Sequence, residues 1–140
     1  MDANLELRDG SMNLNSDEIL TSTKIGPMDR PMYLHVLVPY IKSGDMLDVE
    51  AEFCDNDDPT AQISNMNMKQ IVAVGHYCEP FFTHHDYIQV KLGVTPGTSQ
   101  TASMGSVKVW VDNTASYGGP THTPEKKEEQ VRSDKERLPL

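Results

Sequence analysis

The sequence has few cysteines, few aromatic residues and no long apolar run. Two cysteines, Cys54 and Cys78, are too few for a disulfide framework, so we expect the chain to belong in a reducing compartment. No stretch approaches the roughly 18 apolar residues that a membrane-spanning helix needs, so no membrane partner is expected. The opening residues MDANLELRDG have neither the basic nor the apolar region of a signal peptide, and we expect none.

Basic charge is also scarce. The chain holds 12 Lys and Arg against 21 Asp and Glu, which gives a net charge of −9. The field of such a protein repels phosphate backbones, so we expect no nucleic-acid partner, and a basic protein surface is favoured instead. The imbalance lies entirely in residues 1–120, because residues 121–140 contain five acidic and five basic side chains. This division predicts a body and a tail with different roles.

The body shows the two-residue alternation of β-strands. It is clearest in LDVEAEFC (47–54), YIQVKLGV (87–94) and SVKVWVD (106–112), where apolar residues occupy every second position. MYLHVLVPY (32–40) is more continuously apolar, and weaker candidates are 3–8, 19–25, 66–74 and 77–82. We therefore predict one all-β domain, an eight-stranded jelly roll or β-sandwich, in residues 1–117 with a short N-terminal arm. Residues 118–140 are predicted to form a charged C-terminal arm.

The densest chemical stretch is GHYCEPFFTHHDY, residues 75–87. On a strand His76 and Cys78 would point to one face, which is the best case for a metal site. His84 and His85 are adjacent, so on a strand they face opposite ways and cannot share an ion. Pro80 is typical of an edge strand or a turn. We predict a strand, a turn and a second strand here, and no metal.

No catalytic constellation is expected either. No Ser or Cys lies in a nucleophile elbow, and Cys54 adjoins acidic residues that disfavour a thiolate. The acidic run 54–59 lacks the glycine and terminal glutamate of a calcium-binding EF-hand loop. The sequence therefore predicts a protein that is not an enzyme, with no catalytic residue, metal or cofactor.

Contact residues are expected on the last strand and in the arm. Trp110 lies opposite the buried valines of its strand, which leaves two alternatives, an exposed contact anchor or packing within a covered strand. Two adjacent histidines, His84 and His85, are candidates for pH-sensitive subunit contacts. The candidate contact residues are Trp110, Tyr117, Gly118, Pro120, Lys126, Lys127, Arg132, Lys135, Arg137, Leu138 and Leu140.

The order of these motifs resembles the capsid cement, or decoration, proteins of tailed phages, of the type described for a short-tailed Bordetella phage. The resemblance is carried by ANLELRDGSMNLNSDEILTSTKIGPM, RPMYLHVLV, MLDVEAEFCDNDD and, most closely, YIQVKLGVTPGTSQTASMGSVKVWVD. It covers residues 2–113 and excludes the tail and the histidine-rich stretch at 75–87.

The resemblance implies a jelly-roll body, dimeric or otherwise clustered, on the outer capsid surface of a virion. It implies the major capsid protein and other copies of this chain as partners, after synthesis in the host cytoplasm. Two other functions remain open. One is a different head- or tail-joining component, and the other is a carbohydrate-binding jelly roll, for which Trp110 and Tyr117 would form only a short aromatic row.

Overall fold

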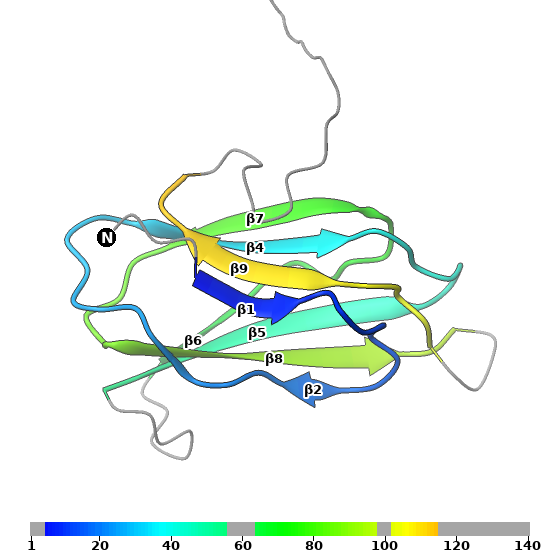
Figure 1. Ribbon diagram of the computed structural model, residues 1–140, viewed down its shortest axis with the longest axis horizontal. Helices are drawn as coiled ribbons and strands as arrows, with labels where there is room; N and C mark the ends of the chain where they lie inside the picture. Colours follow the sequence, from blue (N-terminus) through cyan, green and yellow to red (C-terminus); the bar gives the residue numbers. More distant parts are fainter. Residues whose placement is uncertain (1–4, 56–63, 98–101, 115–140) are drawn as a thin grey trace, which may run out of the picture.

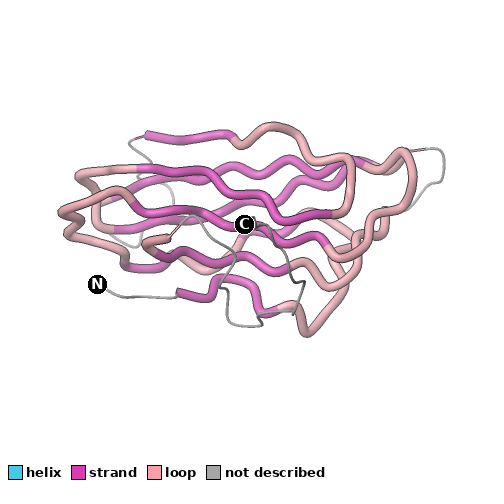
Figure 2. The backbone as a smooth tube through the Cα atoms, turned by 90° about the horizontal axis from the view of Figure 1, so that it is seen from above, coloured by secondary structure: helices cyan, strands magenta, loops and turns pink. Residues whose placement is uncertain are grey.

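Two antiparallel sheets packed face to face form the protein (Figures 1 and 2). The structure, a computed structural model, describes residues 5–55, 64–97 and 102–114. Within these ranges there is no helix, and hence none long and apolar enough to cross a membrane. The predicted all-β sandwich is confirmed. The N-terminal arm at residues 1–4 and the C-terminal arm at 118–140 lie outside the described residues.

One four-stranded sheet, sheet A, has the order β1-β9-β4-β7, and the other, sheet B, has the order β2-β8-β5-β6, with β3 also paired to β8. The strands are β1 (Leu5–Asp9), β2 (Glu18–Ile19), β3 (Thr23–Lys24), β4 (Met32–Val38), β5 (Met46–Cys54), β6 (Ser64–Asn67), β7 (Gly75–Phe81), β8 (Tyr87–Thr95) and β9 (Lys108–Asp112).

The strand order is that of a jelly roll, in which the first and last strands of the body are neighbours in one sheet. β2 and β3 occupy a single strand position, because both pair with β8 and the Leu20 N–H between them donates to the Val90 carbonyl at 2.9 Å. The nine segments therefore fill eight strand positions. Pro80 lies near the end of β7, an edge strand, as the sequence indicated.

The core lies between the sheets and follows the alternation of the sequence. Inward positions of β5 and β8 are almost fully buried, among them Leu47, Val49, Ile88 and Val90. Their outward neighbours on sheet B are polar and pair with one another across strands. Lys91 Nζ lies 2.9 Å from Glu52 Oε2, and further bonds join Asn65 to Glu50 and Gln70 to Asp48.

The outer face of sheet A has a different character. Registers pair His35 of β4 with Trp110 of β9 on one side and with Cys78 of β7 on the other. Directly opposed residues in a sheet project from the same face, so these side chains form one row. His76 lies two residues before Cys78 on β7, opposite Leu37, and projects from the same face. Two of the five histidines, His35 and His76, and the only tryptophan of the chain thus gather on this face.

Candidate functional site

Three rings lie parallel on the outer face of sheet A. The His35 ring is 4.9 Å from the Trp110 ring and 5.0 Å from the His76 ring between centroids, with interplanar angles of 3° and 4°. His35 is 0% exposed and Trp110 1% exposed, whereas His76 is half-buried. The row is positioned by three neighbouring strands, β9, β4 and β7, so its geometry is fixed by the sheet register.

Asp112, at the end of β9, connects this row to the chain beyond the body. Its carboxylate accepts hydrogen bonds from His35 Nε2 at 2.8 Å, Trp110 Nε1 at 3.2 Å and the Thr114 N–H at 3.0 Å. The Thr114 carbonyl in turn accepts from His35 Nε2 at 2.8 Å. Thr114 is the last residue that the structure describes. The Asp112–His35 pair therefore fixes the point where the C-terminal segment begins.

The two acceptors around His35 Nε2 require that nitrogen to carry a proton. The other ring nitrogen, Nδ1, lies 2.7 Å from His76 Nε2, so the three side chains form a continuous Asp112–His35–His76 hydrogen-bonded chain. Burial lowers the pKa of His76 to about 4, and the neighbouring His35 adds to this, while Asp112 opposes it. His76 is consequently neutral at pH 7.

Cys78 lies beside this chain but in the wrong place for thiol catalysis. Its Sγ is 3.9 Å from His35 Nε2, the same nitrogen that bonds Asp112. In a nucleophile–base–acid triad the nucleophile and the acid bind opposite ring nitrogens. Burial raises the pKa of the Cys78 thiol, and the Asp112 and Glu79 carboxylates raise it further. The arrangement therefore holds a protonated thiol instead of activating it.

The histidine pair also has hydrogen-bond geometry instead of metal geometry. Two nitrogens bound to one tetrahedral zinc ion lie about 3.3 Å apart, because each is about 2.0–2.1 Å from the ion. The 2.7 Å between His35 Nδ1 and His76 Nε2 fits a shared proton. In the described part of the chain, no three His, Cys, Asp or Glu side chains are grouped to hold a metal ion.

The lowered pKa of His76 predicts a loss of stability in mild acid. Its folded pKa, about 4, is below the ordinary value of 6.5, so the unfolded chain binds more protons between these values. The contribution of neutral His76 to the stability of the fold is therefore fully present above pH 6.5 and is lost as the pH drops toward 4. Because His76 is half-buried, solvent screening reduces the effect to on the order of 1–2 kcal/mol. Urea unfolding at several pH values between 7 and 4.5 measures it.

His76→Gln should remove this slope, whereas His84→Gln, at an exposed position, should leave it in place. The window stops at pH 4.5 because Glu18 and Asp45 have carboxyl pKa values lowered by hydrogen bonds, and they add their own acid dependence below it. An unchanged slope in His76→Gln would contradict the assignment.

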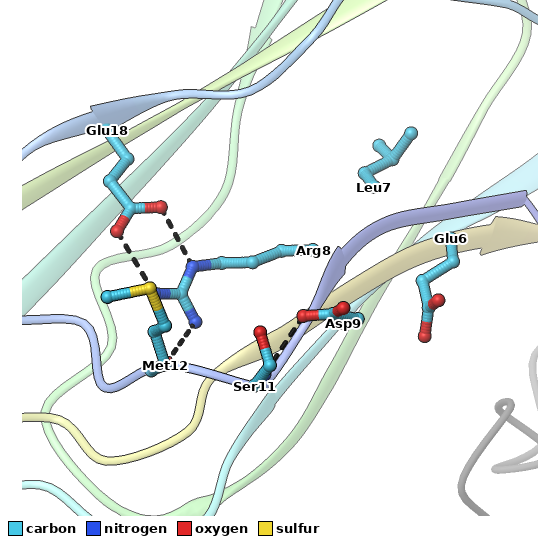
Figure 3. A pocket seen from close by; sticks show the side chains of 7 residues that line it. All are labelled: Glu6, Leu7, Arg8, Asp9, Ser11, Met12 and Glu18. Carbon is cyan, nitrogen blue, oxygen red and sulfur yellow. Dashed lines mark hydrogen bonds and ion pairs between the residues drawn. The ribbon is translucent and has the colours of Figure 1, made fainter.

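A second polar cluster lies at the edge of the sandwich formed by β1 and β2 (Figure 3). Arg8 of β1, in sheet A, reaches Glu18 of β2, in sheet B, through Nε–Oε1 and Nη2–Oε2 bonds of 2.9 and 3.0 Å. Its Nη1 donates to the carbonyls of Met12 at 2.9 Å and Val107 at 2.7 Å. The hydrogen bonds from Arg8 to Glu18 lower the pKa of the Glu18 carboxyl. The open pocket beside them is thus walled by a structural bridge whose charges are already paired.

The structure corrects one of the predicted contact residues. Trp110 projects from the outer face of its sheet, as expected, but it is 1% exposed and packs against His35 and His76. Of the two alternatives, internal packing is the one observed, so Trp110 is not a surface contact anchor. It is equally unavailable as a platform for stacking a sugar ring, which removes half of the aromatic row considered for carbohydrate binding.

The two candidate pH-sensitive histidines lie apart from this network. His85 Nδ1 is 2.8 Å from Asp55 Oδ1, and the His84 ring lies nearly perpendicular to the Phe82 ring at a centroid distance of 5.3 Å. Their role in subunit contacts stays a prediction. The remaining contact candidates lie outside the described residues: Tyr117, Gly118, Pro120, Lys126, Lys127, Arg132, Lys135, Arg137, Leu138 and Leu140.

Sequence reasoning missed His35 and Asp112 altogether. The alternation in β4 places His35 between the buried Leu34 and Val36, and so on the outward face. Only the register of β4 with β7 and β9 shows that it meets His76 and Trp110 there. A signal was present in the outward Trp110, because an aromatic side chain on a nominally solvated face indicates a covered face.

Comparison with known proteins adds no family: no family model matches the chain, and no curated protein matches its sequence.

Proposed function

We propose that this protein is a non-enzymatic virion component that binds the outer surface of a capsid and bridges neighbouring major capsid protein subunits. The observation that carries the proposal is the fixed exit of the chain from a jelly-roll body. Thr114 is held by Asp112 and His35, and residues 115–140 continue from that point. β8 and β9 coincide with the segment that most closely resembles the cement proteins.

The mechanism is bridging by many modest contacts. The body lies across a junction between capsid subunits, and the arm from Gly118 to Leu140 reaches a neighbour. Extended chain covers about 3.3 Å per residue, so the arm spans on the order of 70 Å, enough to cross onto another subunit. Each contact can be weak, since linkage and symmetry make the combined attachment strong. The partners are the major capsid protein and other copies of this chain.

Capsids that carry the protein should resist heat and osmotic shock better than capsids assembled without it. The reason is that each copy ties subunits whose separation begins capsid failure. We expect genome release to shift several degrees lower when the protein is omitted, measured with a DNA-binding dye during heating. Adding back the full chain should restore the wild-type profile. Equal profiles with and without the protein would sink the cement function.

Deletion of residues 119–140 tests the arm within the same proposal. The truncated chain should occupy capsids at a clearly lower level in a binding titration, and undiminished occupancy would show that the body alone attaches.

The number of copies per particle separates this proposal from a head- or tail-joining role. A cement protein is present in hundreds of copies per particle, a joining component in about a dozen or fewer.

A further inference from the structure

The outer faces of the two sheets differ in a way that calls for a covering segment. In a two-layer sandwich, outward residues are ordinarily polar, as they are on sheet B, where Lys91, Glu50 and Asp48 project. On sheet A the outward positions of β4 are Tyr33, His35 and Leu37. Among the described residues no strand packs over this face, since all nine belong to the two sheets. This face therefore presents aromatic and aliphatic side chains where a solvated face would present charged ones, which is typical of a surface on which another segment docks.

The start of the C-terminal segment already lies on this surface. Thr114 follows the end of β9, yet its carbonyl accepts from His35, a residue of the neighbouring strand β4. The chain has therefore turned from β9 toward β4 by Thr114. The Thr114 N–H bond to Asp112 fixes the turn from the other side.

We propose that the outer face of sheet A is the docking surface for residues 115–120 of the same chain, with Tyr117 as the anchoring side chain. Three residues beyond Thr114, Tyr117 is within about 10 Å of it. Neighbouring strands lie about 4.8 Å apart, so Tyr117 can reach across β4 to the half-buried rings of Tyr33 and His76. The sequence Gly118–Gly119–Pro120 then supplies an adaptable segment and a stiff apolar ring, the kind that binds aromatic surfaces.

Continuity favours this occupant over a second copy. The first residues after Thr114 are confined near the face by covalent connection, so their effective concentration exceeds that of any segment arriving from another molecule. A neighbour's segment would have to displace a chain already held by two hydrogen bonds at Thr114. The charged part of the arm, residues 121–140, then starts from sheet A.

Hydrogen exchange on the full-length protein tests the docking without a substitution. The amides of residues 115–119 should exchange at least tenfold more slowly than those of residues 125–138, which serve as the internal reference. Equal, fast exchange in both stretches would overturn the proposal. The protection should not change on tenfold dilution, and protection that disappears on dilution would assign the face to a second copy instead.

Trp110 supplies a second test, because it is the only tryptophan and lies in this face. In the full-length chain Tyr117→Asp should increase acrylamide quenching of its fluorescence about threefold, since the carboxylate does not pack on an apolar face. The matched control is Leu138→Asp, which places the same group in the distal arm and should leave quenching unchanged. Unchanged quenching in Tyr117→Asp would overturn the role of Tyr117. If that variant fails to fold, the exchange measurement on the wild-type chain decides.

Discussion

Trp110→Ala should lower the free energy of unfolding by about 3–5 kcal/mol, the range for removing a large buried aromatic side chain. The ring is 1% exposed and lies parallel to both His35 and His76, and its Nε1 donates to Asp112. A domain of this size is stable by only about 5–15 kcal/mol, so the loss is a large fraction of the total. Urea unfolding followed by far-UV circular dichroism measures it, because the variant has no tryptophan to report.

Two controls separate the contributions of the ring. Trp110→Phe retains an aromatic surface and loses the N–H donor to Asp112, so a smaller loss of about 1–2 kcal/mol is expected. Phe82→Ala removes an aromatic side chain that is 48% exposed and should cost less than about 1 kcal/mol. If Trp110→Ala costs no more than Phe82→Ala, the ring is not packed as described and the surface-contact role returns.

The strands could be predicted from the sequence because alternation is a local property. Each of the eight predicted segments overlaps a strand position, and β5 and β8 match within one residue at each end. The least accurate of the predicted strands was 66–74, because the structure has β6 at Ser64–Asn67. The residues after β6 include Val72 and Val74, which are exposed. Their apolar side chains led to the prediction of a longer buried strand here.

The site could not be predicted because it depends on which strands become neighbours. His35 and Trp110 are 75 residues apart in the numbering, and they meet only because a jelly roll places β4 beside β9. Alternation gives the face from which a side chain projects, but not whether that face is covered. The register between neighbouring strands, and not the spacing of His76 and Cys78 along one strand, decides which groups share a proton.

Arg8 shows the same limit on a smaller scale. Alternation from Leu5 would place Arg8 on the outward face of β1. The register shifts between Glu6 and Arg8, so that Glu6 opposes the outward Trp110 and Arg8 opposes the inward Val109. A one-residue slip transfers every following side chain to the other face, which brings a guanidinium between the sheets. Such a bulge has no signature in the sequence LELRD.

Arg8→Met should destabilise the protein by about 3–5 kcal/mol, because it removes several hydrogen bonds from a charged donor, each worth about 1.5–3 kcal/mol. The Arg8 side chain is 8% exposed, and its guanidinium makes two hydrogen bonds to Glu18. Its removal also leaves the Val107 and Met12 carbonyls without this donor. Urea unfolding at pH 7 measures the change. The matched control is Arg30→Met, because Arg30 and Asp29 are 68% and 86% exposed and such surface pairs contribute about 0–1 kcal/mol.

Glu18→Leu separates the ion pair from the two carbonyl bonds. Arg8→Met leaves a glutamate that is 35% exposed and can remain hydrated, whereas Glu18→Leu leaves a buried cation still bonded to two carbonyls. If the guanidinium acts mainly through the carbonyls, the double variant should be no more stable than Arg8→Met alone. If the ion pair dominates, the double variant should recover part of the loss, because both charges are then replaced by apolar groups. We expect the first outcome, since Val107 lies beside β9 and its carbonyl bond ties β1 and β2 to the strand that carries Trp110. A double variant clearly more stable than Arg8→Met would contradict it.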